Sequence, residues 1–259
     1  MFDQGSGPPI VVVQPLQGRW QWTRRFLDAL SSKCRVITYT LYGDFGADRR
    51  IDASQGFDQF VRQLEEVIDR AGLDRTALCG ISFGGTVALR YAALHPRRVS
   101  HLVIASSPGP GWRLNPEQAG YVARPLLTLP AFLWTAFRRL SAELAASFPR
   151  PVERLAFVAR ATLTALRYPA LPHVMATRAR LMQGVDIAQD AARVTAPTLV
   201  VTGDPSLDHV VPVESTRRFL SHIRNSRYEI MERTGHSGSL TQPERLARIV
   251  GEFVNASHS

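Results

Sequence analysis

Lysine is almost absent from this chain, although its net charge is strongly positive. Lys33 is the only lysine, and arginine supplies the rest of the 31 basic residues, against 22 acidic ones and a formal net charge of +9. A basic chain can bind nucleic acid or an anionic membrane. Here the arginines are spread along the chain in runs no longer than a pair. We therefore interpret the charge as a matter of composition and expect no nucleic-acid partner.

Cysteine is also scarce, and long apolar runs are missing. The two cysteines, Cys34 and Cys79, give neither a disulfide framework nor the spacing of a metal site. The longest apolar stretch, residues 125–137, is too short to span a bilayer and contains proline. The first thirteen residues lack the basic start of a signal peptide. These absences predict a cytoplasmic protein without stable membrane insertion.

The remaining features are those of a globular α/β protein. The chain has 259 residues, 45% hydrophobic and 20% charged, which is enough to bury a substantial core. Short β-branched runs alternate with segments of helical periodicity, which predicts βαβ units and a mostly parallel sheet with helices on both faces. Strands are predicted at residues 10–13, 34–41, 76–79, 99–106, 196–204 and 227–232, and helices at 22–30, 57–72, 214–223 and 243–255.

The alternation stops between residues 109 and 190, where helical periodicity is punctuated by prolines. We interpret this segment as a helical cap inserted into a core of residues 1–108 and 191–259. Its apolar side chains are expected to pack the cap or line a pocket, and its arginines to be solvated. The apolar residues are Trp112, Phe132, Leu133, Trp134, Phe137, Leu140, Phe157 and Met175, and the arginines are at 113, 124, 138, 139, 150, 154, 160, 167, 178 and 180.

One serine lies in a glycine-rich corner, Gly80-Ile81-Ser82-Phe83-Gly84. This G-x-S-x-G pattern follows a predicted strand and precedes a helical segment, which is the context of a nucleophile elbow. Such a turn raises the Ser82 hydroxyl above the sheet and leaves the Phe83 amide free at a helix N-terminus, where it stabilises developing negative charge. A tight βα turn with an idle serine would have the same five residues.

A nucleophilic serine needs a base, and the base needs an orienting carboxylate. Among seven histidines, His236 directly follows the last predicted strand in a glycine-bounded loop, at the edge where open α/β sheets place their sites. The loop after strand 196–204 offers Asp204 and Asp208. Either carboxylate could turn or cap its own loop, so the residues alone leave this choice open.

Together these motifs resemble the α/β-hydrolase superfamily, in its capped group of small esterases, lactonases, C–C bond hydrolases and haloperoxidase-like enzymes. The resemblance covers nearly the whole chain and includes the serine corner, the helical insertion, D-x-x-V-P at 208–212 and Gly235-His236. It implies an α/β-hydrolase fold and Asp208, rather than Asp204, as the third member of a triad. It implies no metal and no cofactor.

The loop after the first predicted strand departs from the pattern of this superfamily. Relatives usually carry His-Gly where Gln14-Pro15 stands here. The resemblance makes the Leu16 amide the second oxyanion donor beside Phe83. Proline removes only its own amide proton, so the donor one residue later survives. Arg19 nearby is expected to be a solvated surface residue.

The expected function is hydrolysis of carboxylic esters of small to moderate, largely apolar molecules, through an acyl-enzyme on Ser82. The same triad would serve C–C bond or lactone hydrolysis, acyl transfer or perhydrolysis. A receptor that uses the same fold with negligible turnover is a further alternative. The expected partner is a small-molecule ester, and the sequence does not indicate an oligomeric state.

Overall fold

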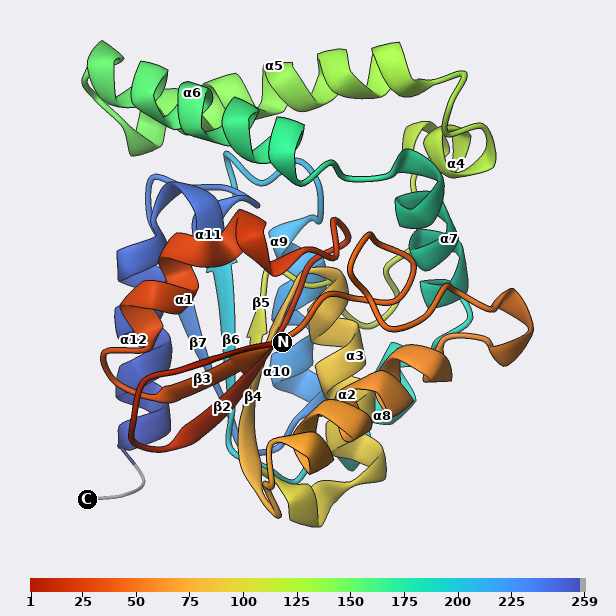
Figure 1. Cartoon of the computed structure of the whole chain (residues 1–259), viewed down its shortest axis with the longest axis vertical. Helices are drawn as coiled ribbons and strands as arrows, with labels where there is room; N and C mark the ends of the chain where they lie inside the picture. Colours follow the sequence, from red (N-terminus) through yellow and green to blue (C-terminus); the bar gives the residue numbers. More distant parts are fainter. Residues whose placement is uncertain (257–259) are drawn as a thin grey trace.

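The computed structural model describes residues 1–256 and centres on a seven-stranded sheet (Figure 1). The strand order is β1-β3-β2-β4-β5-β6-β7, and every neighbouring pair is parallel except β1 with β3. The strands are β1 (Phe2–Gln4), β2 (Pro9–Val13), β3 (Arg35–Thr38), β4 (Thr76–Ile81), β5 (Val99–Ala105), β6 (Thr198–Gly203) and β7 (Ser226–Met231). The predicted α/β class with a mostly parallel sheet is confirmed.

Helices cover both faces of this sheet because its strands are apolar on both sides. In β2, Ile10 and Val12 pack into one core cluster, while Val11 and Val13 pack into the other. Helices α1 and α12 close the first cluster, and α2, α3, α8 and α10 close the second. The helices of the core are α1 (Arg24–Leu30), α2 (Asp58–Arg70), α3 (Phe83–Leu94), α8 (Ile187–Arg193), α9 (Val213–Arg217), α10 (Phe219–His222), α11 (Gly238–Thr241) and α12 (Pro243–Asn255).

Two elements differ from the predicted ones. Strand β1 was not predicted, since only Phe2 of its three residues is buried and no alternating pattern marks it. It pairs at the edge of the sheet with β3. The helix predicted over 214–223 is two short helices, α9 and α10, which meet at Arg218.

Four helices of the cap lie between β5 and α8. They are α4 (Pro116–Ala123), α5 (Leu129–Ser147), α6 (Pro151–Arg167) and α7 (Pro172–Met182). Each has a proline in its first turn, where the missing amide proton costs no hydrogen bond. The prolines therefore mark where these helices begin. Helices α5 and α6 run across one end of the molecule (Figure 1).

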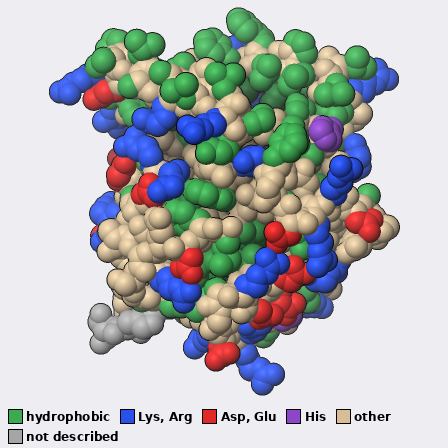
Figure 2. Space-filling view, in the orientation of Figure 1, with side chains coloured by type: hydrophobic (Ala, Val, Ile, Leu, Met, Phe, Trp, Pro, Cys, Tyr) green, Lys and Arg blue, Asp and Glu red, His purple; other side chains and the backbone are tan. Residues whose placement is uncertain are grey.

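The cap leaves many of its apolar side chains in contact with solvent. Trp112 and Phe157 are buried as expected, but Leu133, Trp134 and Phe137 are 57%, 63% and 64% exposed. For these three residues the expectation that they pack the cap or line a pocket was wrong. Figure 2 shows apolar side chains gathered over this end of the molecule. None of the helices described within residues 1–256 is long and apolar enough to cross a membrane.

Candidate active site

The serine corner is a sharp turn between β4 and α3, and close packing explains its glycines. Ser82 has φ 52° and ψ −118°, a strained backbone for a residue with a side chain. A Cβ atom on Gly80 would lie 2.3 Å from the Gly84 carbonyl oxygen, and one on Gly84 would lie 2.2 Å from the Val13 carbonyl oxygen. Glycine at both positions thus lets α3 approach the ends of β4 and β2.

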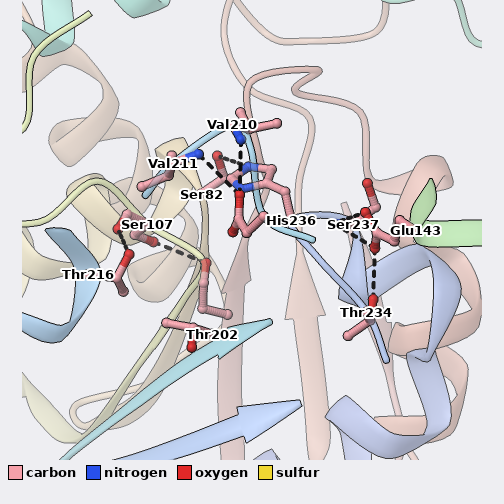
Figure 3. A network of polar contacts seen from close by, with 12 residues as sticks. Ser82, Ser107, Glu143, Thr202, Val210, Val211, Thr216, Thr234, His236 and Ser237 are labelled. Atoms are coloured by element: carbon pink, nitrogen blue, oxygen red, sulfur yellow. Dashed lines mark hydrogen bonds and ion pairs between the residues drawn. The ribbon is translucent and has the colours of Figure 1, made fainter. Parts of the chain in front are cut away.

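The structure brings together the serine, histidine and aspartate predicted from the sequence. The Nε2 atom of His236 lies 3.1 Å from the Oγ atom of Ser82 (Figure 3). Its Nδ1 atom lies 3.3 Å from the Oδ2 atom of Asp208. The three side chains come from the loops that follow β4, β7 and β6, so they meet at the carboxyl edge of the parallel strands. The arrangement suits proton transfer from a hydroxyl to an oriented imidazole.

Asp208 and Asp204 have different surroundings, and only Asp208 contacts His236. The buried Asp208 carboxylate accepts hydrogen bonds from the amides of Val210 and Val211, both at 3.1 Å. Burial opposes its ionisation, but the attraction and hydrogen bond of His236 and these amides outweigh burial and lower its pKa. Asp204 instead accepts hydrogen bonds from the amide and hydroxyl of Ser206. Its carboxylate turns the loop.

His236 is held so that its charged form is stabilised. Burial disfavours the imidazolium, but the charge and hydrogen bond of Asp208 outweigh burial and raise the pKa of His236 above its ordinary value. The carboxylate of Glu143 adds a smaller effect in the same direction. An imidazole with a raised pKa is a stronger base, and it is free to accept a proton only above that pKa.

The two predicted oxyanion donors come from different segments: Phe83 directly follows Ser82, and Leu16 lies in the loop after β2. Phe83 begins α3, and Leu16 lies in a turn closed by a hydrogen bond of 2.8 Å from the Gly18 amide to the Pro15 carbonyl. Within residues 1–256, neither the Leu16 nor the Phe83 amide donates to another protein group. Both N–H groups therefore remain available to a ligand.

Gln14 anchors the loop that departs from the superfamily pattern. Its side chain is fully buried. The Gln14 amide donates to the Thr38 hydroxyl at 2.8 Å, and its carbonyl accepts from the Thr23 hydroxyl at 2.8 Å. Because the side chain has hydrogen-bond partners on β3 and in the short 3-10 helix Trp20–Thr23 before α1, the turn that carries Leu16 starts from a fixed point.

Arg178 on α7 joins the cap to the same turn. It is fully buried and donates to the Leu16 carbonyl at 2.8 Å, to the Tyr42 carbonyl at 2.7 Å and to the Asp44 carboxylate at 2.5 Å. The prediction that this arginine is solvated was wrong. The same holds for Arg19, which is 9% exposed and stacks over the ring of Tyr168. Both arginines pair with residues far away in the sequence, which no local pattern reveals.

Glu143 on α5 is a buried carboxylate that the sequence did not single out. It is 3% exposed. It accepts hydrogen bonds from the Thr234 hydroxyl at 2.7 Å, the Ser237 amide at 3.1 Å and the Thr241 hydroxyl at 3.2 Å. Thr234 and Ser237 flank His236 in the chain, so the hydrogen bonds of Glu143 to them lie beside the histidine (Figure 3). A cap helix thus holds the loop that carries His236.

A cavity of about 300 Å³ lies between α6 and the segment before α1. Trp20, Trp22, Phe157 and Tyr168 give it aromatic walls, and its lining also includes Leu240 on α11, close to His236 in the chain. Ser82 is not among its lining residues. In residues 1–256, no three His, Cys, Asp or Glu side chains gather as a metal-binding group.

Known proteins match this chain over almost its full length. A model of the "Alpha/beta hydrolase family" matches residues 7–249. A 2-hydroxymuconate semialdehyde hydrolase of Pseudomonas sp. (strain CF600) is 28% identical over 270 residues, covering 98% of this chain and 89% of the relative. The 3-oxoadipate enol-lactonase 1 of Acinetobacter baylyi is 25% identical over 255 residues, covering 97% and 90%.

Solved structures share the fold at lower sequence identity. An esterase from Exiguobacterium antarcticum superposes with a TM-score of 0.78 at 20% identity, covering 98% of this chain and 94% of that chain.

Proposed function

We propose that this chain, which belongs to the alpha/beta hydrolase family, is a serine hydrolase that cleaves carboxylic esters through an acyl-enzyme. One observation carries the proposal. The Ser82 hydroxyl lies 3.1 Å from the Nε2 atom of His236, and the Nδ1 atom of the same ring faces the buried carboxylate of Asp208. That arrangement activates a hydroxyl as a nucleophile.

In the acylation step, His236 Nε2 takes the proton of Ser82 as its Oγ atom attacks the ester carbonyl carbon. The carbonyl oxygen gains the negative charge and accepts hydrogen bonds from the Leu16 and Phe83 amides. Collapse of this intermediate breaks the bond to the alkoxide, which takes the proton from His236 and leaves as the alcohol. Asp208 stabilises the imidazolium that exists between these two transfers.

In the deacylation step, a water molecule takes the place of the alcohol. His236 accepts a proton from the water as its oxygen attacks the acyl carbon. The second intermediate uses the same two amides, and its collapse returns the proton to the Ser82 oxygen and releases the carboxylic acid. The residues end as they began, so the cycle needs no other reactant.

The substrate we propose is small to moderate in size and largely apolar. The support for this class is the aromatic cavity beside α6, which borders α11 next to the His236 loop but is not lined by Ser82. Each methylene buried against such walls is worth about 0.8 kcal/mol. Lengthening an acyl chain by two carbons should therefore raise kcat/KM by up to about tenfold, since 1.4 kcal/mol is a factor of ten. Chains longer than the pocket should gain nothing.

The second candidate is cleavage of a lactone or C–C bond in an acidic substrate. The names of the relatives support it, and so does Arg160, which lines the cavity and pairs with no carboxylate in the described chain. Burial and the charge of Arg25 lower the pKa of Arg160, so an anion there would relieve both effects. An acidic ester that outperforms its neutral analogue, with an advantage that shrinks in added salt, would favour this candidate.

Labelling with a fluorophosphonate tests the proposal without a known substrate, because the reagent reacts only with an activated serine. We expect labelling of the wild type, none in Ser82→Ala, and nearly equal thermal stability of the two proteins, since one hydroxyl contributes little to folding. A panel of neutral and acidic esters then separates the candidates. An unlabelled wild type would favour the receptor alternative.

A further inference from the structure

The outer side of α5 and α6, together with the turn before α5, is the largest collection of exposed apolar side chains on the described chain. Of fourteen large hydrophobic residues that are exposed, ten lie between positions 126 and 166. We call these ten the cap face, which Figure 2 shows as a band of apolar atoms over the end of the molecule. They are Leu126, Leu127, Leu133, Trp134, Phe137, Val152, Leu155, Val158, Leu163 and Leu166.

Helical spacing places Trp134 and Leu166, two residues of the cap face, on the sides of their helices opposite a buried residue. Trp134 and the buried Glu143 are nine residues apart on α5. At 100° per residue, that separation is two and a half turns, so the two side chains lie on opposite sides of the helix. Leu166 and the buried Phe157 are also nine residues apart on α6. Each helix therefore buries one side against the core and presents an apolar side to solvent. Monomeric soluble proteins rarely leave so large a patch uncovered without a use.

Positive charge surrounds the cap face. Seven arginines lie between positions 124 and 167, while Glu153 is the only carboxylate there besides the buried Glu143. Among the described residues, only Arg139 and Arg150 of these seven pair with a carboxylate. The remaining five leave their charge without an acidic partner. This segment therefore contributes most of the net charge of +9.

This charge decides between the possible occupants of the cap face. A symmetric contact between two copies would place the arginines of one cap against those of the other, which is unfavourable. An anionic lipid surface provides the opposite charge together with an apolar interior. Helices that lie in a membrane interface combine Trp, Phe and Leu on one side with flanking basic residues. Helix α5 has all three kinds of apolar residue on its exposed side, and α6 adds exposed leucines and valines.

We propose that the cap face docks the protein reversibly on anionic lipid membranes. The two aromatic rings of Trp134 and Phe137, whose centroids are 6.3 Å apart, would enter the interface. Of the unpaired arginines, Arg124, Arg138, Arg154 and Arg167 would contact lipid phosphates, whereas Arg160 lines the cavity. This attachment needs no spanning helix and does not depend on the reaction at Ser82.

Sedimentation with vesicles tests the proposal on the full-length protein. We expect binding to vesicles that mix phosphatidylglycerol into phosphatidylcholine, and little binding to phosphatidylcholine alone. Raising the salt from about 0.05 to about 0.5 M should release the protein, because the charges are then screened. Binding to both vesicle types alike, or to neither, would overturn the proposal.

Matched variants locate the contact. Trp134→Ser with Phe137→Ser should weaken vesicle binding by at least about tenfold. Phe45→Ser is the control, since Phe45 is 62% exposed but lies outside the cap, and it should bind as the wild type does. Arg138→Gln with Arg167→Gln should reduce the salt dependence, whereas the exposed Arg97→Gln should not. Thermal melting of each variant excludes unfolding as the cause.

Light scattering provides the competing outcome. A protein that dimerises with concentration, and becomes monomeric when Trp134 and Phe137 are replaced, would make the cap face an interface between two copies. Equal loss of vesicle binding in the Phe45→Ser control would also contradict the proposal.

Discussion

The sheet core and the outer cap helices use their apolar residues in opposite ways. In the core, strand residues such as Val11 and Val12 are fully buried on alternate faces, and helices close both sides. In α5 and α6, only Glu143, Leu144 and Phe157 are buried. The core thus stabilises itself by packing, whereas these two helices rest on it through a few contacts.

The proposed catalytic residues lie in the densely packed core, whereas most of the large exposed apolar residues lie on the cap. The loops at the carboxyl edge of the sheet supply the proposed triad, and the dense packing behind them fixes its geometry. The cap supplies contacts to those loops, one wall of the cavity beside α6 and an outer surface. Substitutions in the core should therefore change stability or catalysis strongly, and substitutions on the cap face should change neither by much.

The largest contrast is expected between two aspartates of one core loop. Asp208→Asn should lower kcat by about 10⁴-fold, because the imidazole loses the carboxylate that orients it and stabilises its charge. Asp204→Asn should stay close to the wild type, since Asp204 contacts Ser206 and not His236. Steady-state kinetics on one ester measures both. If Asp208→Asn kept wild-type activity and Asp204→Asn were inactive, Asp204 would be the aspartate of the triad.

A large effect on stability should distinguish a core aromatic from a cap aromatic. Phe60 is fully buried and meets the ring of Phe83 edge-on at 5.2 Å. Phe60→Ala should reduce the free energy of unfolding by about 3–5 kcal/mol. Trp134→Ala should change it by no more than about 0.5 kcal/mol, as is usual for an exposed side chain. Denaturant unfolding compares the two, and a similar loss in both variants would mean that the cap face is buried in solution.

A smaller effect is expected where the two regions meet. Glu143→Gln keeps one oxygen that can accept from Thr234. It replaces the other carboxylate oxygen with an NH2 group and removes the negative charge beside the loop that carries His236. We expect kcat to fall about tenfold with less change in KM, since a weakened buried hydrogen bond costs about 1–3 kcal/mol. The control is Glu153→Gln, on the neighbouring cap helix. If the thermal stability of Glu143→Gln falls while its kcat is unchanged, Glu143 serves the fold alone.

The smallest expected effect is a shift in pH dependence. The pKa of His236 is raised, so kcat/KM should rise with pH around a midpoint above about 6.5, the ordinary value for histidine. Below that midpoint the imidazole is protonated and cannot accept the Ser82 proton. In Glu143→Gln the midpoint should move down, because one of the charges that raise the pKa is gone. A midpoint below 6.5 in the wild type would contradict the stabilised imidazolium.

The sequence predicted the core better than the cap for a physical reason. Strand patterns, the glycine corner around Ser82 and the position of His236 after the last strand are local, and a parallel sheet brings the ends of its strands together. Even Asp208 could be named, although only through the resemblance to a family. The short β1 escaped prediction because three residues carry no pattern.

The features that sequence reasoning missed depend on contacts between distant segments. Arg178 pairs with Asp44, which is 134 residues away in the sequence, and Glu143 accepts a hydrogen bond from Thr234, which is 91 residues away. Nothing near either residue in the chain distinguishes it from a solvated charge. Likewise, the periodicity of α5 shows that one side is apolar but does not show whether that side meets the core or the solvent.

Arg178 and Glu143 also limit how this fold can be rebuilt. Arg178 connects α7 to the turn that carries Leu16, and Glu143 connects α5 to the loop that carries His236. An engineer who replaced the cap with that of another hydrolase would exchange more than a substrate pocket. Unless the new helices provided a guanidinium and a carboxylate at these two places, the buried Asp44 would lose its counter-charge and the Ser237 amide its acceptor. The cap of this protein is therefore not an interchangeable module.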